Sequence, residues 1–339
     1  MTNQNSTDFA QLTVSFLTDY LPLQRGFSNN TILSYRDTFK LLLRFLVNDK
    51  AFDLKKFTLQ DLDRNLVLEF LSSYRNKGAS SRTANQRLAA IKTFCEYAST
   101  EVPDSLNELL AVRNIKFKRA PGRQIQFLNV DQTTLLINLP DIRSRTGLRH
   151  RVILTLLYDS GCRVQELCDL TVGDVFLCNA VSTVKLHGKG NKTRTVFISK
   201  ATAKLLSLYK EKFHRNSLAD TPFIKGRYSG KIKRNGIAYV LDKYGREAAL
   251  QDPTFPLHIH CHMLRHSKAM HMLQAGVEVT RIRDFMGHED VSTTMVYVKA
   301  DNRIKEEVIG KLAQKIVKDA PQEDWTEDKD LMAFLDTLG

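Results

Sequence analysis

Four groups of residues in the second half of the chain carry side chains suited to phosphate chemistry. Each group has an ordinary structural explanation when it is taken alone, so the order in which they occur is what matters. The groups are centred, in chain order, on Arg163, on Lys189, on His262 with Arg265, and on His288 with Tyr297.

Arg163 follows a Gly-Cys turn and is expected to open a helix, where backbone N–H groups also face an anion. A guanidinium offers a planar fork of donors that matches two phosphate oxygens. The alternative is a surface pair between Arg163 and Glu166, since residues three apart on a helix are neighbours. The same spacing rule places His262, Arg265 and His266 on one helical face.

Lys189 lies between two glycines in a predicted hairpin turn, from which an ammonium can protonate a leaving 5′-oxygen. The alternative is a solvated lysine in a polar turn. Lys192 and Arg194 nearby are candidates for DNA phosphate contacts. Tyr297 is a poor nucleophile at a pKa near 10, so it needs a phosphate already neutralised by cations. Its alternative role is packing.

Zinc is an alternative for the cluster of four histidines in this region. No second set of ligands and no HExxH pattern accompanies them, so no metal is expected. Packing or capping roles remain open for His258, His260 and His266. The four are His258, His260, His262 and His266.

Together these residues form the set that phosphodiester exchange without a metal requires. Two arginines and a histidine neutralise the charge on the phosphate, the lysine serves the leaving group, and the tyrosine attacks in line. The bond energy stays in the phosphotyrosine, so neither ATP nor another cofactor is expected.

The chain has 339 residues, 42% of them hydrophobic, which is enough for two domains with cores of their own. A formal charge of +13 favours a polyanionic partner, nucleic acid first, although a merely basic enzyme is the alternative. Five scattered cysteines without a CxxC pair suggest neither disulfides nor a zinc ribbon, and a reducing cytoplasm fits them. No apolar run approaches roughly 18 residues, so no membrane span is expected.

The apolar spacing predicts helices throughout residues 8–100, including one after Ser28 and others at 59–77 and 80–99. Residues 113–124 combine five cations with a Pro-Gly break, as in a domain linker, though a solvated loop within one domain is the alternative. We therefore expect a helical DNA-binding domain at 1–115, a basic linker at 116–125 and a catalytic domain at 126–318. Linker cations expected near DNA are Lys116, Lys118 and Arg119.

Beyond the linker, helices are expected at 130–138 and 149–159, and another opens close to Arg163. Alternating residues at 181–187 and 193–199 predict two strands joined by a Gly-Lys-Gly-Asn-Lys hairpin turn. Helical patterns return at 200–214, at 235–249 and from 260 to nearly 316. Within the last of these, Gly287 is expected to end one helix and leave His288 exposed at the break, and the next short helix presents Tyr297. Residues 319–339 form an acidic tail with a short apolar helix near its end.

The motifs, taken in order, resemble those of the tyrosine recombinase, or phage integrase, family, in the style of Xer recombinases and mobile-element integrases. The N-terminal part adds Ser28, Asn30, Thr31 and Tyr35, similar to the start of the family's DNA-clamping domain. Departures are Met286, Cys162 and the Val298-Lys299 pair. The matching motifs are Gly161-x-Arg163-x-x-Glu166-Leu167, Gly188-Lys189-Gly190-Asn191-Lys192-x-Arg194, His262-x-Leu264-Arg265-His266, and Gly287-His288 through Thr293-Thr294-x-x-Tyr297.

The resemblance implies a mainly α fold with a small antiparallel sheet. A helical SAM-like domain and an α+β catalytic domain would form a C-shaped clamp around duplex DNA. It also implies a homo-tetramer on two DNA sites and a Holliday junction, with Tyr297 as nucleophile. The terminal helix, 331–338, is expected to dock on a neighbouring subunit, or else on its own domain. The other catalytic residues it implies are Arg163, Lys189, His262, Arg265 and His288.

Integration and excision of a mobile element is the expected role, because the acidic tail and scattered substitutions differ from a housekeeping Xer protein; accessory proteins are a further expectation. Three alternatives remain. They are Xer-type dimer resolution, a type IB topoisomerase, and a DNA-binding regulator that has lost catalysis.

Overall fold

The structure, a computed structural model, describes residues 7–119, 125–188, 192–226, 230–288 and 290–300. The chain divides into two compact units, Met1–Arg123 and Gln124–Gly339. The division falls within the basic segment expected to be a linker.

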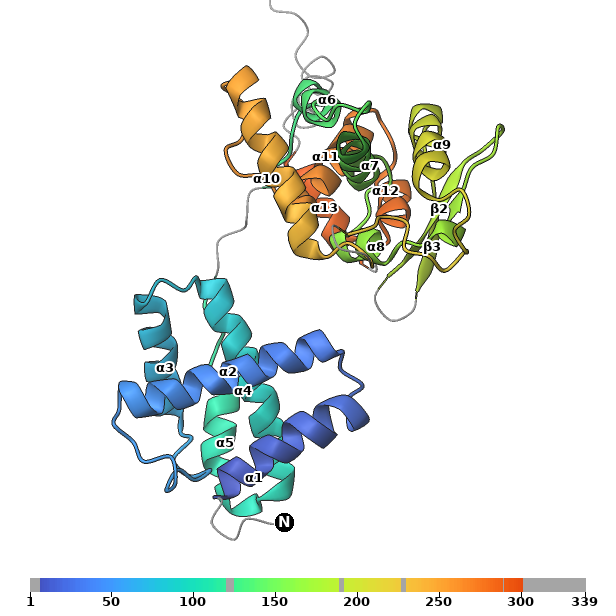
Figure 1. Ribbon diagram of the computed structural model, residues 1–339. Coiled ribbons are helices and arrows are strands. Elements are labelled where there is room, and N and C mark those ends of the chain that lie inside the picture. The colour runs from blue at the N-terminus through green and yellow to red at the C-terminus, as the bar shows by residue number, and fades with distance from the viewer. Residues whose placement is uncertain (1–6, 120–124, 189–191, 227–229, 289, 301–339) are drawn as a thin grey trace, which may run out of the picture. The chain divides into compact units, whose positions relative to one another are not determined.

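The first unit is built from helices, as its apolar spacing predicts (Figure 1). Side-chain caps start several of them, because the first backbone N–H groups of a helix lack partners within it. Asp63 accepts from the Leu66 N–H at 2.7 Å, and Ser80 accepts from the Thr83 N–H at 3.1 Å. The elements are α1 (Asp8–Ser15), a π-helical turn (Phe16–Gln24), α2 (Asn29–Asn48), α3 (Arg64–Asn76), α4 (Ser81–Glu101), a 3₁₀ turn (Pro103–Ser105) and α5 (Leu106–Arg113).

Aromatic rings form the centre of the first unit's core. Phe94 on α4 makes edge-on contacts with Phe9, Phe16 and Phe39, with ring centroids 5.1–5.5 Å apart. All four side chains are almost completely buried, so this unit has a core independent of the second.

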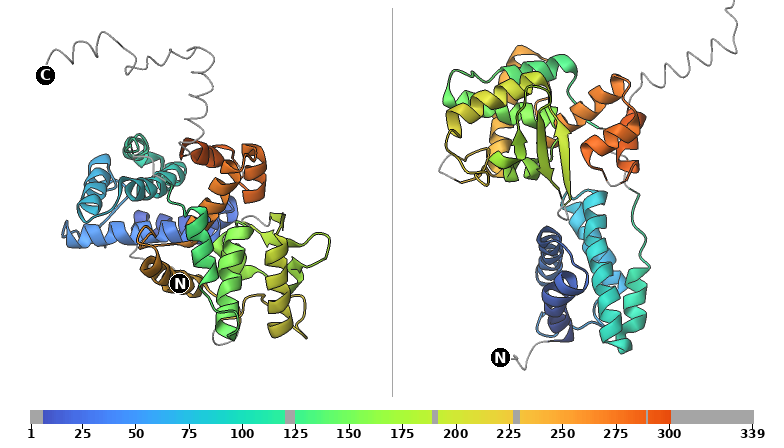
Figure 2. Two further views of the ribbon diagram at one scale, coloured as in Figure 1. Left: turned by 90° about the horizontal axis from the view of Figure 1, so that it is seen from above. Right: turned by 90° about the vertical axis from the view of Figure 1, so that its right-hand side faces the viewer.

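The second unit consists of helices and one small sheet (Figure 1). Helix α11 packs on α7, α12 and α13, while β2, β3 and α9 stand together on one side (Figure 2). Its elements are α6 (Val130–Asn138), α7 (Arg145–Asp159), α8 (Val164–Asp169), a 3₁₀ turn (Val172–Asp174), β1 (Val175–Phe176), β2 (Thr183–His187), β3 (Thr193–Phe197), α9 (Lys200–Phe213), α10 (Arg234–Gln251), α11 (Cys261–Gln274), α12 (Val279–Met286) and α13 (Ser292–Ala300).

The sheet is antiparallel in the order β1-β2-β3, which confirms the predicted hairpin and adds a short strand that the pattern does not predict. Val184 lies between Val175 and Val196, and this row faces the core. The next row, Phe176, Thr183 and Phe197, lies on the opposite face because side chains alternate along a strand. The sheet thus has one face in the core and one with exposed phenylalanines.

The helical pattern expected from residue 260 onward ends at Gly287, as predicted, and is also interrupted at Gly276, which the pattern does not predict. Gly276 has φ +80° just after α11, and Gly287 ends α12 with φ +63°. Such left-handed backbone is easily adopted by glycine and terminates a helix. Residues 301–339, including the acidic tail and the expected terminal helix, lie outside the described residues.

None of the helices in the described ranges is both long and apolar enough to cross a membrane. All five cysteines are free thiols, and Cys95, Cys162 and Cys168 are buried.

Candidate active site

Glu166 is the hub of an ion-pair network at the start of α8. Its buried carboxylate accepts from both terminal nitrogens of Arg194, at 2.7 and 2.8 Å, and from Nη1 of Arg163 at 2.9 Å. It also accepts from the backbone N–H of Arg163 at 2.7 Å, so this carboxylate occupies the helix start where an external anion was expected. Burial by itself would raise the pKa of Glu166, but the bonds from Arg194 and Arg163 hold it below its ordinary value.

Arg163 therefore forms the ion pair with Glu166 that the sequence indicates as the alternative to phosphate binding, but it also contacts a residue far away in the sequence. Its Nη2 donates to the Gly287 carbonyl at 3.0 Å, across 124 residues of sequence. Arg163 remains 38% exposed in its side chain, so it can still meet a ligand. Arg194, a predicted phosphate contact, is only 15% exposed, and both of its terminal nitrogens donate hydrogen bonds to Glu166.

Arg265 is buried on α11 and links the turn at Gly161 to the end of α12. It donates from Nη1 to the Gly161 carbonyl and from Nη2 to the Met286 carbonyl, the second at 2.5 Å. Burial, together with the nearby Arg163 and Arg194 charges, lowers the pKa of Arg265 to about 10, so it remains charged at neutral pH. A buried cation close to other cations forms a local positive field suited to an anion.

Tyr297 on α13 is 2% exposed, and its hydroxyl lies 2.9 Å from Nδ1 of His266 on α11. Burial raises the pKa of Tyr297, while the charge of Arg265 acts in the opposite direction. The phenol is therefore protonated and held inside the unit, next to the arginine cluster.

His288 follows the break at Gly287 and stacks on Tyr297, with ring centroids 6.4 Å apart and planes 13° apart. Its Nδ1 lies 2.9 Å from the Thr294 hydroxyl. Burial first, and then the charges of the three neighbouring arginines, lower the pKa of His288 to about 4. The ring is therefore neutral at pH 7.

His262 lies at the exposed start of the same α11 face, with its ring 6.3 Å from that of His266. Partial desolvation, followed by the charge of Arg265, lowers its pKa. Among the described residues, no group of three or more His, Cys, Asp or Glu side chains is placed to hold a metal ion.

Lys189 lies outside the described residues, between the end of β2 and Lys192. Lys192 is exposed just before β3. In the first unit, Lys116, Lys118 and Arg119 are exposed, and the backbone of Lys118 is tied to Asn85 on α4 by two hydrogen bonds of 2.7 and 3.0 Å. These linker cations thus project from a segment that follows α5 and is bonded to α4.

Five of the six predicted catalytic residues are described, and the links among Arg163, Arg265 and the α12–α13 segment bring them into one region of the second unit. Sequence reasoning missed two further members, Glu166 as a hub and His266 as the partner of the tyrosine. The signal for Glu166 was its spacing from Arg163, and the signal for His266 was its place on the Arg265 face. Each had an ordinary structural explanation.

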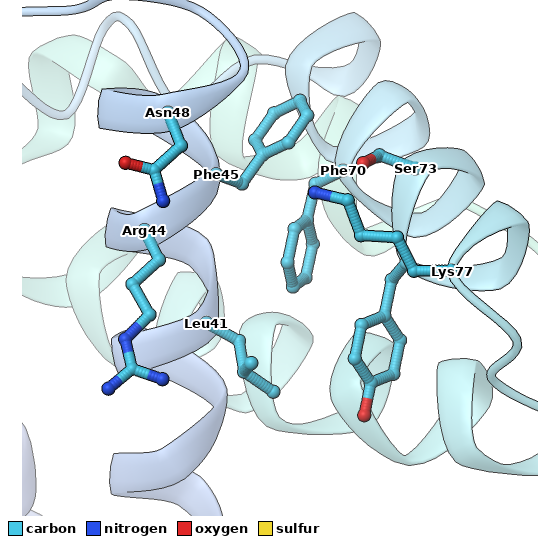
Figure 3. A pocket seen from close by; sticks show the side chains of 8 residues that line it. Leu41, Arg44, Phe45, Asn48, Phe70, Ser73 and Lys77 are labelled. Atoms are coloured by element: carbon cyan, nitrogen blue, oxygen red, sulfur yellow. The ribbon is translucent and has the colours of Figure 1, made fainter.

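The first unit has a pocket of its own. Figure 3 shows it between α2 and α3, where Arg44 and Asn48 stand across from Ser73 and Lys77. Lys77 there is paired with Asp49 at 2.7 Å. The pocket contains none of the residues that the sequence singles out for chemistry.

Comparisons with known proteins match both units. Residues 126–303 match the phage integrase family, and residues 15–101 match the phage integrase N-terminal SAM-like domain. An integrase/recombinase of Sinorhizobium fredii, y4rC, is 32% identical over 97% of this chain and 98% of its own length. Tyrosine recombinase XerD of Staphylococcus epidermidis is 29% identical over 82% of this chain and 90% of its own length.

Solved structures share the fold. The XerH site-specific recombinase bound to a palindromic difH substrate superposes with a TM-score of 0.64 at 22% identity, covering 82% of this chain and 78% of that one. The Tn1549 transposon integrase in complex with transposon right end DNA gives a TM-score of 0.64 at 16% identity, covering 88% of this chain and 99% of that one.

Proposed function

Since the chain belongs to the phage integrase family of tyrosine recombinases, we propose that it cuts and rejoins double-stranded DNA through a covalent bond between Tyr297 and a 3′-phosphate. The observation that carries the proposal is the convergence of Arg163, Arg265 and His288 around the α12–α13 segment that bears Tyr297. Such a cluster neutralises a phosphate and leaves a phenol beside it.

The proposed roles follow from charge and position. Arg163 and Arg265 neutralise the non-bridging oxygens of the scissile phosphate, and Glu166 orients Arg163. His288, neutral at pH 7, donates a hydrogen bond to the phosphate rather than a charge. His262 binds from the exposed start of α11, and Lys189 protonates the leaving 5′-oxygen.

The tyrosine must be uncovered for this reaction. Its side chain is 2% exposed, so the phenol oxygen cannot meet a phosphorus atom in the conformation described here. DNA binding therefore has to displace the residues that cover Tyr297 and open a path to its hydroxyl, with α11 and α13 still packed together.

A covalent adduct tests the proposal. The chain is expressed in bacterial cells, and the cells are lysed in denaturant. DNA that remains attached to the protein is then recovered and sequenced. We expect adducts from the wild type and none from Tyr297→Phe, which lacks the hydroxyl. Tyr239→Phe, at an exposed tyrosine on α10, should leave adducts unchanged. Adducts from Tyr297→Phe would remove this residue from its role.

Arginine variants separate chemistry from binding. Arg163→Ala and Arg265→Ala should abolish cleavage while leaving most DNA affinity, because affinity is spread over many phosphate contacts such as those proposed for Lys116, Lys118, Arg119 and Lys192. Gel-shift titration beside the adduct assay measures both. Affinity that falls in proportion to cleavage would contradict the proposal.

For the biological role, we propose integration and excision of a mobile element, carried out in the cytoplasm by a homo-tetramer on two DNA sites with accessory proteins. The near full-length similarity to y4rC of Sinorhizobium fredii supports the integrase role. Dimer resolution is a second candidate, favoured by the similarity to XerD and XerC proteins. Sequences recovered from the adducts separate the two, since element ends or a chromosomal dimer-resolution site would be enriched. The size of the complex on that DNA tests the tetramer.

A further inference from the structure

Tyrosine hydroxyls meet histidine rings at several places in the second unit, and one of these pairs contains the nucleophile. In each pair the hydroxyl lies within hydrogen-bond distance of the Nδ1 atom. Among the described residues the pairs are His150 with Tyr244 at 3.2 Å, His271 with Tyr158 at 2.9 Å, and His266 with Tyr297 at 2.9 Å.

The Tyr297 hydroxyl needs a proton acceptor. Burial keeps its pKa above the ordinary value of 10, and the opposing effect of Arg265 does not remove that rise. At neutral pH the phenol therefore carries its proton, which has to leave as the oxygen attacks phosphorus. A positioned side chain with a pKa near the working pH serves best, and imidazole is such a group.

Three histidines lie near the tyrosine, and the geometry separates them. His288 stacks on the phenol ring and directs its Nδ1 to Thr294. His262 is exposed at the start of α11, one ring further away, with its centroid 6.3 Å from that of His266. His266 is the one of the three whose ring nitrogen lies within hydrogen-bond distance of the hydroxyl itself, at 2.9 Å, so the proton can pass directly to it.

We propose that His266 is a catalytic residue that accepts the proton of the Tyr297 hydroxyl. This inference rests on the proposed function. Accepting through Nδ1 requires the neutral tautomer with its proton on Nε2. The charged and titratable groups around the pair are His262 and Arg265 on α11, His288 after α12, Arg163 before α8, and Arg194 on β3.

The O–H bond of Tyr297 breaks and its proton moves to Nδ1 of His266, while the phenol oxygen forms a bond to phosphorus. The bond from phosphorus to the 5′-oxygen breaks, and that oxygen takes a proton from Lys189. Rejoining reverses each transfer, so His266 returns the proton to the phenol and no oxidant or cofactor is needed.

The test measures adduct formation against pH on a duplex that carries the cleavage site recovered from wild-type adducts. A 5′-bridging phosphorothiolate replaces the leaving oxygen, so the leaving group needs no proton and the rate reports on the nucleophile. We expect His266→Gln to slow adduct formation by about 100-fold or more at pH 7, because glutamine can bond the hydroxyl but cannot take its proton. Its rate should then climb steadily with pH, whereas the wild-type rate should level off above the titration of imidazole.

His271→Gln is the matched control, since it alters a His–Tyr bond of the same length on the same helix, away from the nucleophile. It should keep the wild-type pH profile. If His266→Gln does not fold, as judged by circular dichroism, His266→Ala with added imidazole replaces it. We then expect the rate to recover with the pH dependence of free imidazole.

The outcomes distinguish the two proposals. Adducts from Tyr297→Phe would defeat the proposed function itself. If the wild type forms adducts and His266→Gln forms them at a rate within threefold of the wild type, only the role of His266 is overturned. A uniform loss at every pH with an unchanged profile would also overturn it, because that is the result of a purely structural contact.

Discussion

Replacing Glu166 by glutamine should destabilise the second unit more than any exposed charge change of the same kind. The carboxylate is 2% exposed and accepts four hydrogen bonds from Arg163 and Arg194. In Glu166→Gln the charge is lost, and an amide N–H₂ must face guanidinium donors. Removing one partner of a buried ion pair costs about 3–5 kcal/mol, and we expect about 3 because Arg163 is 38% exposed and regains water.

The assay is urea unfolding followed by far-UV circular dichroism, with the free energy of unfolding taken from the transition that the variant shifts. Glu211→Gln is the matched control, since it removes an exposed pair with Arg215 on the same unit and should cost less than about 1 kcal/mol. The pKa of Glu166 is lowered in the folded state, so its contribution is complete above the ordinary value of 4.5. The difference between wild type and variant should shrink as the pH falls through the lowered pKa.

A double variant shows whether the cost comes from an orphaned charge. Adding Arg194→Met to Glu166→Gln removes the more buried guanidinium, so the double variant should be more stable than the sum of the two single changes predicts. Additivity within about 0.5 kcal/mol, or a cost of Glu166→Gln no larger than that of the control, would refute this reasoning.

Two further predictions concern the turn after α12. Gly287→Ala should cost more than Gly276→Ala in thermal unfolding and should also reduce adduct formation. Both have positive φ, where a side chain costs about 1–2 kcal/mol, but only at Gly287 would the new Cβ lie 2.9 Å from Arg194 Cδ; equal costs would contradict this. The pKa of His288 is about 4 in the folded protein, below its ordinary 6.5, so between these values the unfolded chain binds a proton more tightly than the folded one. The free energy of unfolding is therefore highest above pH 6.5 and decreases as the pH falls toward 4. His288→Gln should therefore flatten the fall in melting temperature between pH 6.5 and 4, and an unchanged slope would count against it.

Local rules predict most of the second unit's elements. The alternating runs at 181–187 and 193–199 become β2 and β3, and Gly287 ends a helix as expected. The strand β1 escapes prediction because two residues carry no readable period, and it exists only by pairing with β2. The helix expected at 59–77 starts at Arg64 instead, since the carboxylate of Asp63 caps it there.

The sequence predicts which residues belong to the site, but not which of them bond to one another. Arg163 and Glu166 are three residues apart, which is the spacing of an ordinary surface pair. What distinguishes them is Arg194, 28 residues from Glu166, whose approach depends on how the β2–β3 hairpin packs on α8. Likewise, the bond from His266 to Tyr297 depends on the packing of α11 on α13, which helical periodicity does not contain.

The reach of Arg265 has a consequence for how the protein is made. One guanidinium joins carbonyls 104 residues before it and 21 residues after it. Contacts between residues far apart in sequence form late in folding, because the entropy of closing a long loop is lost before the contact stabilises the chain. A nascent chain still inside the ribosome beyond Arg265 lacks the Met286 anchor and the tyrosine together. The proposed catalytic set is therefore completed only after Tyr297 has been synthesised, by which time the first unit has had time to fold.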